Sequence, residues 1–117
     1  MNIIQYSLLT LVAIIHLYIL VLEMLLWTKP KGIKTFGLKS KDFAEETKVL
    51  AANQGLYNGF LAAGLTWSIL SQKIDVGIFF LICVFIAGLY GSFSTKKPRI
   101  FVIQSIPALL GLISLIL

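Results

Sequence analysis

The chain has 117 residues, of which 58% are hydrophobic and only 13% are charged, and its mean hydropathy is +0.93. A soluble domain of this length cannot hide so much apolar surface, because a small chain keeps a large share of its residues at the surface. The formal charge of +5 gives no reason to expect a nucleic-acid partner, because the sidedness of a membrane protein explains the same lysines. The composition therefore predicts an integral membrane protein, with the lipid bilayer as its main partner.

Four apolar runs fill the chain almost end to end. Each is long enough to cross a bilayer, which needs roughly 20 apolar residues at about 1.5 Å rise per residue. We expect one integral membrane domain over residues 1–117, an all-α bundle of four transmembrane helices. The expected spans cover about residues 3–27, 48–70, 76–94 and 100–117, and the expected cytoplasmic link covers residues 28–47.

The basic residues lie almost wholly in two of the three links between these spans. Nine of the ten Lys and Arg residues lie in the 28–47 link, at the start of the second span, or in the link before residue 100. Cationic side chains resist translocation, so both basic links are expected to be cytoplasmic. Both termini would then be extracytoplasmic, in a multi-pass protein of the cell membrane.

The 28–47 link is expected to be irregular at first and helical at its end. Pro30, Gly32 and Gly37 are expected to break any helix early in the link. Ser40 can cap a new helix that runs unbroken into the second span. Apolar residues alternate with the lysines, which allows the link to lie on the inner headgroup surface. An ordinary solvated loop is the alternative.

Small residues recur every four positions in the second span, at Ala51, Gly55, Gly59 and Ala63. Side chains four residues apart share a helix face, and small ones let another backbone approach closely. We expect this face to pack inside the monomer. A homodimer interface is the alternative.

Polar side chains inside the spans are the candidates for function. Glu23 is foremost, because a carboxylate in an apolar span costs at least ~2.5 kcal/mol and should face the bundle or a water-filled cavity. His16 lies two turns earlier on the same helix face, about 10 Å away along the backbone. In the expected orientation the polar groups gather in the cytoplasmic half, and the outer halves hold little beyond Thr, Ser and Gln5. The predicted ligand-binding residues are His16, Glu23, Gln54, Asn58, Tyr90 and Gln104, and the predicted supporting residues are Trp27, Glu46, Asn53 and Tyr57.

This polar layer is compatible with three functions. The leading hypothesis is a protein that binds or transports a small molecule or lipid in a cavity open to the cytoplasm, with a proton exchanged at Glu23. The second is an accessory subunit whose polar groups only tie helices together. The third is a membrane-embedded, isomerase-like enzyme that moves protons with His16 and Glu23. No metal site is expected, because no HxxxH or ExxH motif is present, and the sequence does not identify a cofactor.

Several short runs are similar to one known family. They are HLYI at 16–19, EM at 23–24 with Trp27, FGL at 36–38, EETKVLAANQGLYNGF at 45–60, GxYG at 88–91 and QxxPA at 104–108. These runs resemble the bacterial and fungal membrane proteins grouped as domain of unknown function 1304 (DUF1304). The resemblance covers the whole chain and implies four transmembrane helices and no established activity. It places the most specific motif on the expected cytoplasmic half of the second span, at Glu46, Asn53, Gln54, Tyr57 and Asn58.

Overall fold

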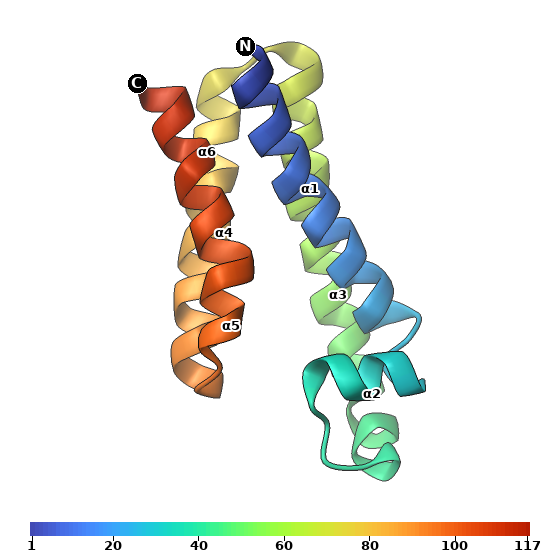
Figure 1. The fold of residues 1–117 in the computed structure, drawn as a ribbon. Coiled ribbons are helices and arrows are strands. Elements are labelled where there is room, and N and C mark those ends of the chain that lie inside the picture. The colour runs from blue at the N-terminus through green and yellow to red at the C-terminus, as the bar shows by residue number, and fades with distance from the viewer. The chain divides into compact units, whose positions relative to one another are not determined.

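A computed structural model describes all 117 residues, which form helices joined by short connections (Figure 1). The elements in chain order are α1 (Ile3–Met24), α2 (Pro30–Phe36), α3 (Lys41–Ser71), α4 (Ile74–Thr95), α5 (Pro98–Ile100), the π-helical segment η1 (Phe101–Ser105) and α6 (Ile106–Ile116). The last three follow one another without a break and form one helical stretch from Pro98 to Ile116. The all-α prediction is confirmed.

Three of these helices are long and apolar enough to cross a membrane: α1, α4 and the Pro98–Ile116 stretch. Helix α3 is longer still, with 31 residues or about 46 Å at 1.5 Å per residue. Helix α3 is therefore long enough to cross a membrane, but Asn53, Gln54 and Asn58 interrupt its apolar sequence. The fourth span and the four-helix bundle remain predictions.

The chain divides into two compact units, and helices α1 and α3 each contribute to both. Unit 1 comprises Met1–Ile15 and Leu61–Leu117, and unit 2 comprises His16–Phe60. Both divisions fall inside continuous helices rather than in flexible linkers.

Unit 1 is built around an apolar core that receives side chains from four helical segments. Its most deeply buried members are Leu9 and Val12 of α1, Leu65 of α3, Leu81 and Val84 of α4, and Ala108 of α6. Helices α4 and α6 lie side by side, as Figure 1 shows. A Cβ added to Gly88 of α4 would collide with the hydroxyl of Ser105, so this glycine permits the close approach.

The π-helical turn η1 ends at Ser105, two residues before Pro107. Proline has no backbone N–H, so it cannot bond the carbonyl four residues earlier, and a wider turn accommodates the missing donor. The Ile106 N–H donates to the Phe101 carbonyl five residues back, as in a π-helix. The Ser105 hydroxyl donates to the Phe85 carbonyl at 2.9 Å and ties this turn to α4.

In unit 2, the expectation that three residues would prevent a helix early in the link is wrong. Pro30 occupies the first turn of α2, where a missing N–H costs nothing. Gly37 ends α2 in the left-handed conformation, with a φ of 61°, as glycine does at helix C-termini. Gly32 lets α2 lie close to the turn that precedes it, because a Cβ there would collide with the backbone carbonyl of Leu26. The three residues that suggested a loop therefore begin a short helix, let it pack closely and end it.

The predicted cap and the continuous second helix are confirmed. The Phe43 N–H donates to the Ser40 hydroxyl oxygen at 3.0 Å, and α3 then runs unbroken to Ser71. Trp27, three residues after the end of α1, contacts both other helices of unit 2, and its indole N–H donates to the Thr47 hydroxyl of α3 at 3.0 Å. The Trp27 ring also packs on Phe36 of α2, with 4.9 Å between centroids.

The small-residue face of α3 packs against α1 inside unit 2, as predicted. A Cβ added to Gly55 would lie 2.6 Å from Cγ of Met24, and one added to Gly59 would lie 2.7 Å from a methyl group of Leu20. Ala63 does not continue this face, since Ala62 is buried in its place and Ala63 is exposed. A helix has 3.6 residues per turn, so an exact four-residue spacing drifts off one face.

Candidate functional site

The Glu23 carboxylate meets the Asn58 side chain inside unit 2. The side-chain amide of Asn58 donates to Oε1 of Glu23 at 2.7 Å, which joins the last turn of α1 to the middle of α3. Glu23 is only 8% exposed. The predicted inward orientation of Glu23 is therefore what the structure shows.

Gly55 makes this contact possible. A Cβ at Gly55 would lie 3.1 Å from Cβ of Glu23, so the missing side chain lets α1 come close at this level. Asn58 follows three residues later, nearly one turn along the same face of α3. The same Asn58 nitrogen also donates to the Gln54 carbonyl at 3.2 Å, which fixes the orientation of its amide.

The Glu23 carboxylate can accept more hydrogen bonds than the Asn58 amide supplies. A carboxylate has two oxygens that can together accept about four hydrogen bonds. Here Oε1 accepts from Asn58, which is the hydrogen bond found for this carboxylate, and Oε2 is not among the fully buried atoms that lack a partner. A buried carboxyl group with a spare acceptor can bind a cation, a hydroxyl group or a proton.

The other predicted ligand-binding residues occupy varied positions. His16 is fully buried on α1, two turns before Glu23. Gln54 is exposed on α3. Tyr90, which is 71% exposed, and the half-buried Gln104 belong to unit 1. The structure thus brings together Glu23 and Asn58, and the role of the other four in one site stays a prediction.

Of the four predicted supporting residues, one makes a contact between helices and three are exposed. Trp27 anchors the link through Thr47, as described above. Glu46, Asn53 and Tyr57 are exposed. The Asn53 amide donates to the Val49 carbonyl of its own helix at 3.0 Å, and the Tyr57 ring meets Phe60 edge-on. No group of three or more His, Cys, Asp or Glu side chains lies close enough together to hold a metal ion.

Sequence reasoning missed a second polar cluster, at the start of α1 in unit 1. The Met1 amino group donates to Oε1 of Gln72 at 2.8 Å, and the Gln72 amide donates to the Tyr6 hydroxyl. The Gln5 amide donates to the Ser114 carbonyl at 2.8 Å, and Asn2 and Gln5 cap each other's backbone N–H. Met1, Asn2 and Gln72 lie outside the expected spans, so this cluster adds to the few polar groups expected in their outer halves. The Asn2-x-x-Gln5 spacing of a capping box was the signal that could have revealed it.

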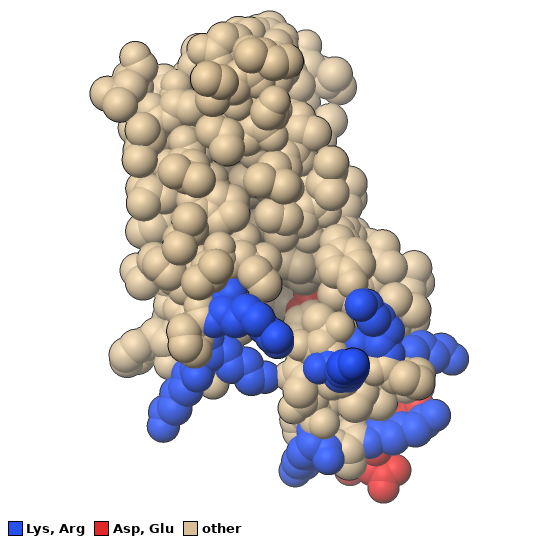
Figure 2. All heavy atoms as spheres, in the orientation of Figure 1, with Lys and Arg blue, Asp and Glu red and all other residues tan.

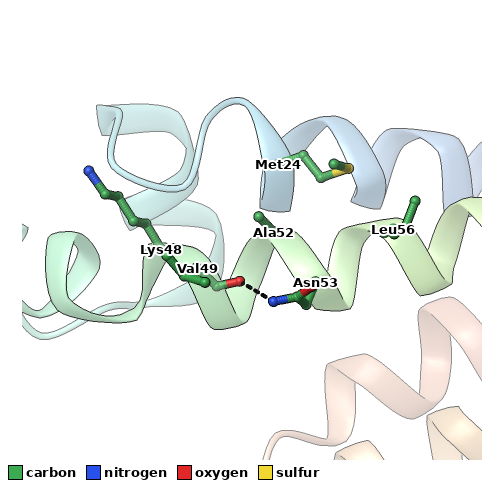
Figure 3. A pocket seen from close by; sticks show the side chains of 6 residues that line it. All are labelled: Met24, Lys48, Val49, Ala52, Asn53 and Leu56. Carbon is green, nitrogen blue, oxygen red and sulfur yellow. Dashed lines mark hydrogen bonds between the residues drawn. The ribbon is translucent and has the colours of Figure 1, made fainter.

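It also missed an open groove of about 410 Å³ on unit 2 (Figure 3). Its lining residues come from the end of α1 and the first half of α3: Met24, Lys48, Val49, Ala52, Asn53 and Leu56. Four of the six are apolar, so a search for chemically reactive residues passes over them.

The fold and these contacts define a class: a small all-α protein whose three long apolar helices indicate a membrane protein, with a buried carboxyl–amide contact. The chain belongs to the family DUF1304, described as protein of unknown function, whose family model matches residues 10–116. It is 31% identical over 117 residues to the uncharacterized protein YpaA of Lactococcus lactis subsp. lactis (strain IL1403). The aligned region covers 97% of this chain and 98% of that protein. No solved structure matches this chain. The resemblance seen in the short sequence runs is confirmed.

Proposed function

We propose that the chain is a multi-pass protein of the cell membrane in which α3 spans the bilayer together with the three apolar helices. The distribution of charge supports this topology. In unit 2, lysines gather around α2 and the start of α3, and in unit 1 Lys and Arg gather at the link between α4 and α5 and the first turn of α5 (Figure 2). Basic segments of this kind stay on the cytoplasmic side, which leaves both termini outside.

We further propose that the protein binds, and in the fuller hypothesis transports, a small cationic or hydroxylated ligand at Glu23. The single observation that carries this proposal is the buried carboxylate with one satisfied oxygen. Placing an ionised carboxylate in an apolar span is costly, and one amide donor recovers only part of that cost. A cation, or a hydroxyl that donates to Oε2, supplies the missing interaction. A proton taken up by the carboxyl group would do the same, which would couple ligand exchange to protons.

A purely structural role fits this contact less well. Interhelical hydrogen bonds in membranes contribute roughly 0.6 to 2 kcal/mol, and neutral side chains such as Ser, Asn or Gln supply them at lower cost than a carboxylate. His16, Gln54, Tyr90 and Gln104 remain the proposed further lining residues. The proposal requires only Glu23 and Asn58 and is tested on them.

Ethidium, a small fluorescent organic cation, is a suitable probe. We expect the purified protein in lipid nanodiscs to bind ethidium, as measured by the rise in its fluorescence. Glu23→Gln keeps the shape of the side chain and an oxygen acceptor for Asn58 but removes the charge, and we expect it to weaken binding at least tenfold, about 1.4 kcal/mol. Asp75→Asn is the matched control, since it removes one exposed carboxylate and keeps the oxygen that accepts from Val76.

Two results would decide against the proposal. Equal ethidium binding by the wild type and Glu23→Gln would exclude Glu23 as the binding group. Equal loss in Glu23→Gln and Asp75→Asn would show that net charge, rather than this site, governs binding. Circular dichroism of each variant establishes that its helices are intact.

A further inference from the structure

The groove on unit 2 has its own chemistry, and neither Glu23 nor Asn58 lines it. Met24 of α1 lies close to α3, since a Cβ added to Gly55 would be 2.6 Å from its Cγ. In Figure 3, Ala52 and Leu56 point from α3 toward α1. Lys48 lies at one end of the groove, near the start of α3 and the basic link. Four of the six lining residues are apolar, Asn53 adds a side-chain amide, and Lys48 lies at one end with its ammonium directed away from Met24, Ala52 and Leu56.

Lys48 also marks a sharp change in the surface of α3. The eight residues from 41 to 48 read KDFAEETK and include five charged side chains. The next two residues, Val49 and Leu50, are apolar and are 66% and 73% exposed. Exposed apolar residues directly after a charged turn indicate the depth at which water gives way to lipid.

Trp27 independently marks the same depth. Its indole N–H is bonded to Thr47, the residue directly before Lys48. Indole rings favour the headgroup region, because one side is apolar and the N–H needs a polar partner. The ammonium of Lys48 then lies at the level of lipid phosphates, and the apolar part of the groove lies at the level of acyl chains.

We propose that this groove holds one anionic glycerophospholipid, with an acyl chain along Met24, Ala52 and Leu56 and its phosphate at the Lys48 ammonium. The volume of about 410 Å³ is within the range of roughly 300–1,000 Å³ that is common for small-molecule sites. This inference rests on the membrane placement proposed above and does not depend on ligand binding at Glu23.

Charge complementarity favours an anionic lipid over a zwitterionic one. Unit 2 presents five further exposed lysines on α2, on its flanking links and at the first position of α3: Lys29, Lys31, Lys34, Lys39 and Lys41. Their summed potential attracts anionic lipids, and Lys48 adds a directed contact within the groove. Glu45 lies 3.3 Å from Lys48, but both side chains are about half exposed, and pairs of this kind contribute little. A lipid phosphate can therefore replace Glu45 as the partner.

Quenching of Trp27 by brominated lipid chains tests this site directly. In the Trp67→Phe background, Trp27 is the remaining tryptophan. The protein is placed in phosphatidylcholine vesicles that contain either dibrominated phosphatidylglycerol or dibrominated phosphatidylcholine at equal mole fraction. We expect the phosphatidylglycerol to quench about fivefold more effectively, the change expected for about one lysine at a charged lipid surface.

Single-residue variants separate a site from diffuse attraction. Lys48→Gln should abolish most of this preference. Lys34→Gln removes an exposed lysine of α2 that does not line the groove and should preserve most of it. Glu45→Gln removes the competing carboxylate and should increase the preference. Circular dichroism shows whether each variant keeps its helices.

Three outcomes would overturn the inference. Equal quenching by the two brominated lipids would show that the groove does not select anionic lipid. Equal losses in Lys48→Gln and Lys34→Gln would show that general surface charge attracts the lipid without a defined site. Absence of quenching by either lipid would contradict the membrane placement itself, whereas a failure confined to the Glu23→Gln ethidium experiment would leave the lipid site standing.

Discussion

The two units of this chain use their polar side chains in opposite ways. In unit 1, the cluster of Met1, Tyr6 and Gln72 lies at helix ends, where backbone groups need partners in any case. In unit 2, the Glu23–Asn58 contact joins the last turn of α1 to the middle of α3 within a helix–helix packing face, and it caps no backbone group. Polar groups at helix ends are explained by the fold alone. A buried carboxylate on a packing face costs stability, which makes it the better candidate for function.

Asn58→Leu is expected to have the largest effect, because it leaves the buried Glu23 carboxylate without its donor. The loss of a hydrogen bond to a charged group predicts a decrease of about 2–3 kcal/mol in the free energy of unfolding. Unfolding by SDS in mixed micelles, followed by circular dichroism, measures it. An unchanged midpoint would mean that the contact does not hold the two helices together.

The double variant Glu23→Leu/Asn58→Leu sharpens this test. Removing both members of a buried polar pair is often close to neutral, so most of the lost stability should return. Ethidium binding should stay lost. If the double variant recovered both properties, the pair would be a structural contact like those of unit 1.

Gly55→Ala is expected to rank next, because the new Cβ would lie 2.6 Å from Met24 and 3.1 Å from Glu23. Overpacking of a close helix contact predicts a loss of about 1–3 kcal/mol in the same SDS assay. Gly91→Ala is the matched control in unit 1, where the nearest atom, in Ile100, would be 3.4 Å away. A similar loss in both variants would indicate a general intolerance of alanine rather than a close approach of α1 and α3.

Trp27→Phe is expected to have a smaller effect. It keeps a ring against Phe36 but removes the hydrogen bond to Thr47, which predicts a loss of about 1 kcal/mol. Thr47→Val removes the other partner, and the double variant should cost little more than either single change. Additive losses would show that the two side chains act separately.

Gln72→Ala is expected to have the smallest effect, below about 1 kcal/mol, because its partners in unit 1 are exposed to solvent. The SDS midpoint again measures it. A loss as large as that of Asn58→Leu would remove the contrast between the two clusters.

Much of the fold follows from local sequence. The helical class, the long apolar helices, the Ser40 cap and the packing of Gly55 against a neighbouring helix were all predictable. Each depends on residues close together in the chain or on one helix face. The short helix α2 was missed because Pro30 and Gly37 were treated as helix breakers, whereas their positions suit the first turn and the C-terminal end of a helix.

Much less of the candidate site was predictable. Glu23 was recognisable because a carboxylate in an apolar helix carries a free-energy cost. Asn58 was one of several side-chain amides on α3. Which amide meets Glu23 depends on how α1 and α3 align, and Gln54, only one turn away from Asn58, is exposed instead. The groove as a whole was not predictable: Asn53 was a predicted supporting residue, but four of the six lining residues are ordinary apolar ones.

The sequence by itself determined that this is an all-helical, strongly apolar chain of its family with one costly carboxyl group in the first long helix. Hydropathy and capping act over a few neighbouring residues, so they can be read without knowing the packing. Only the tertiary structure decided that Asn58 is the partner of Glu23, that the bond goes to one oxygen of the carboxylate, and that Met24 and α3 line an open groove. Those features depend on the distance between two helix axes, which Gly55 sets by the side chain it lacks.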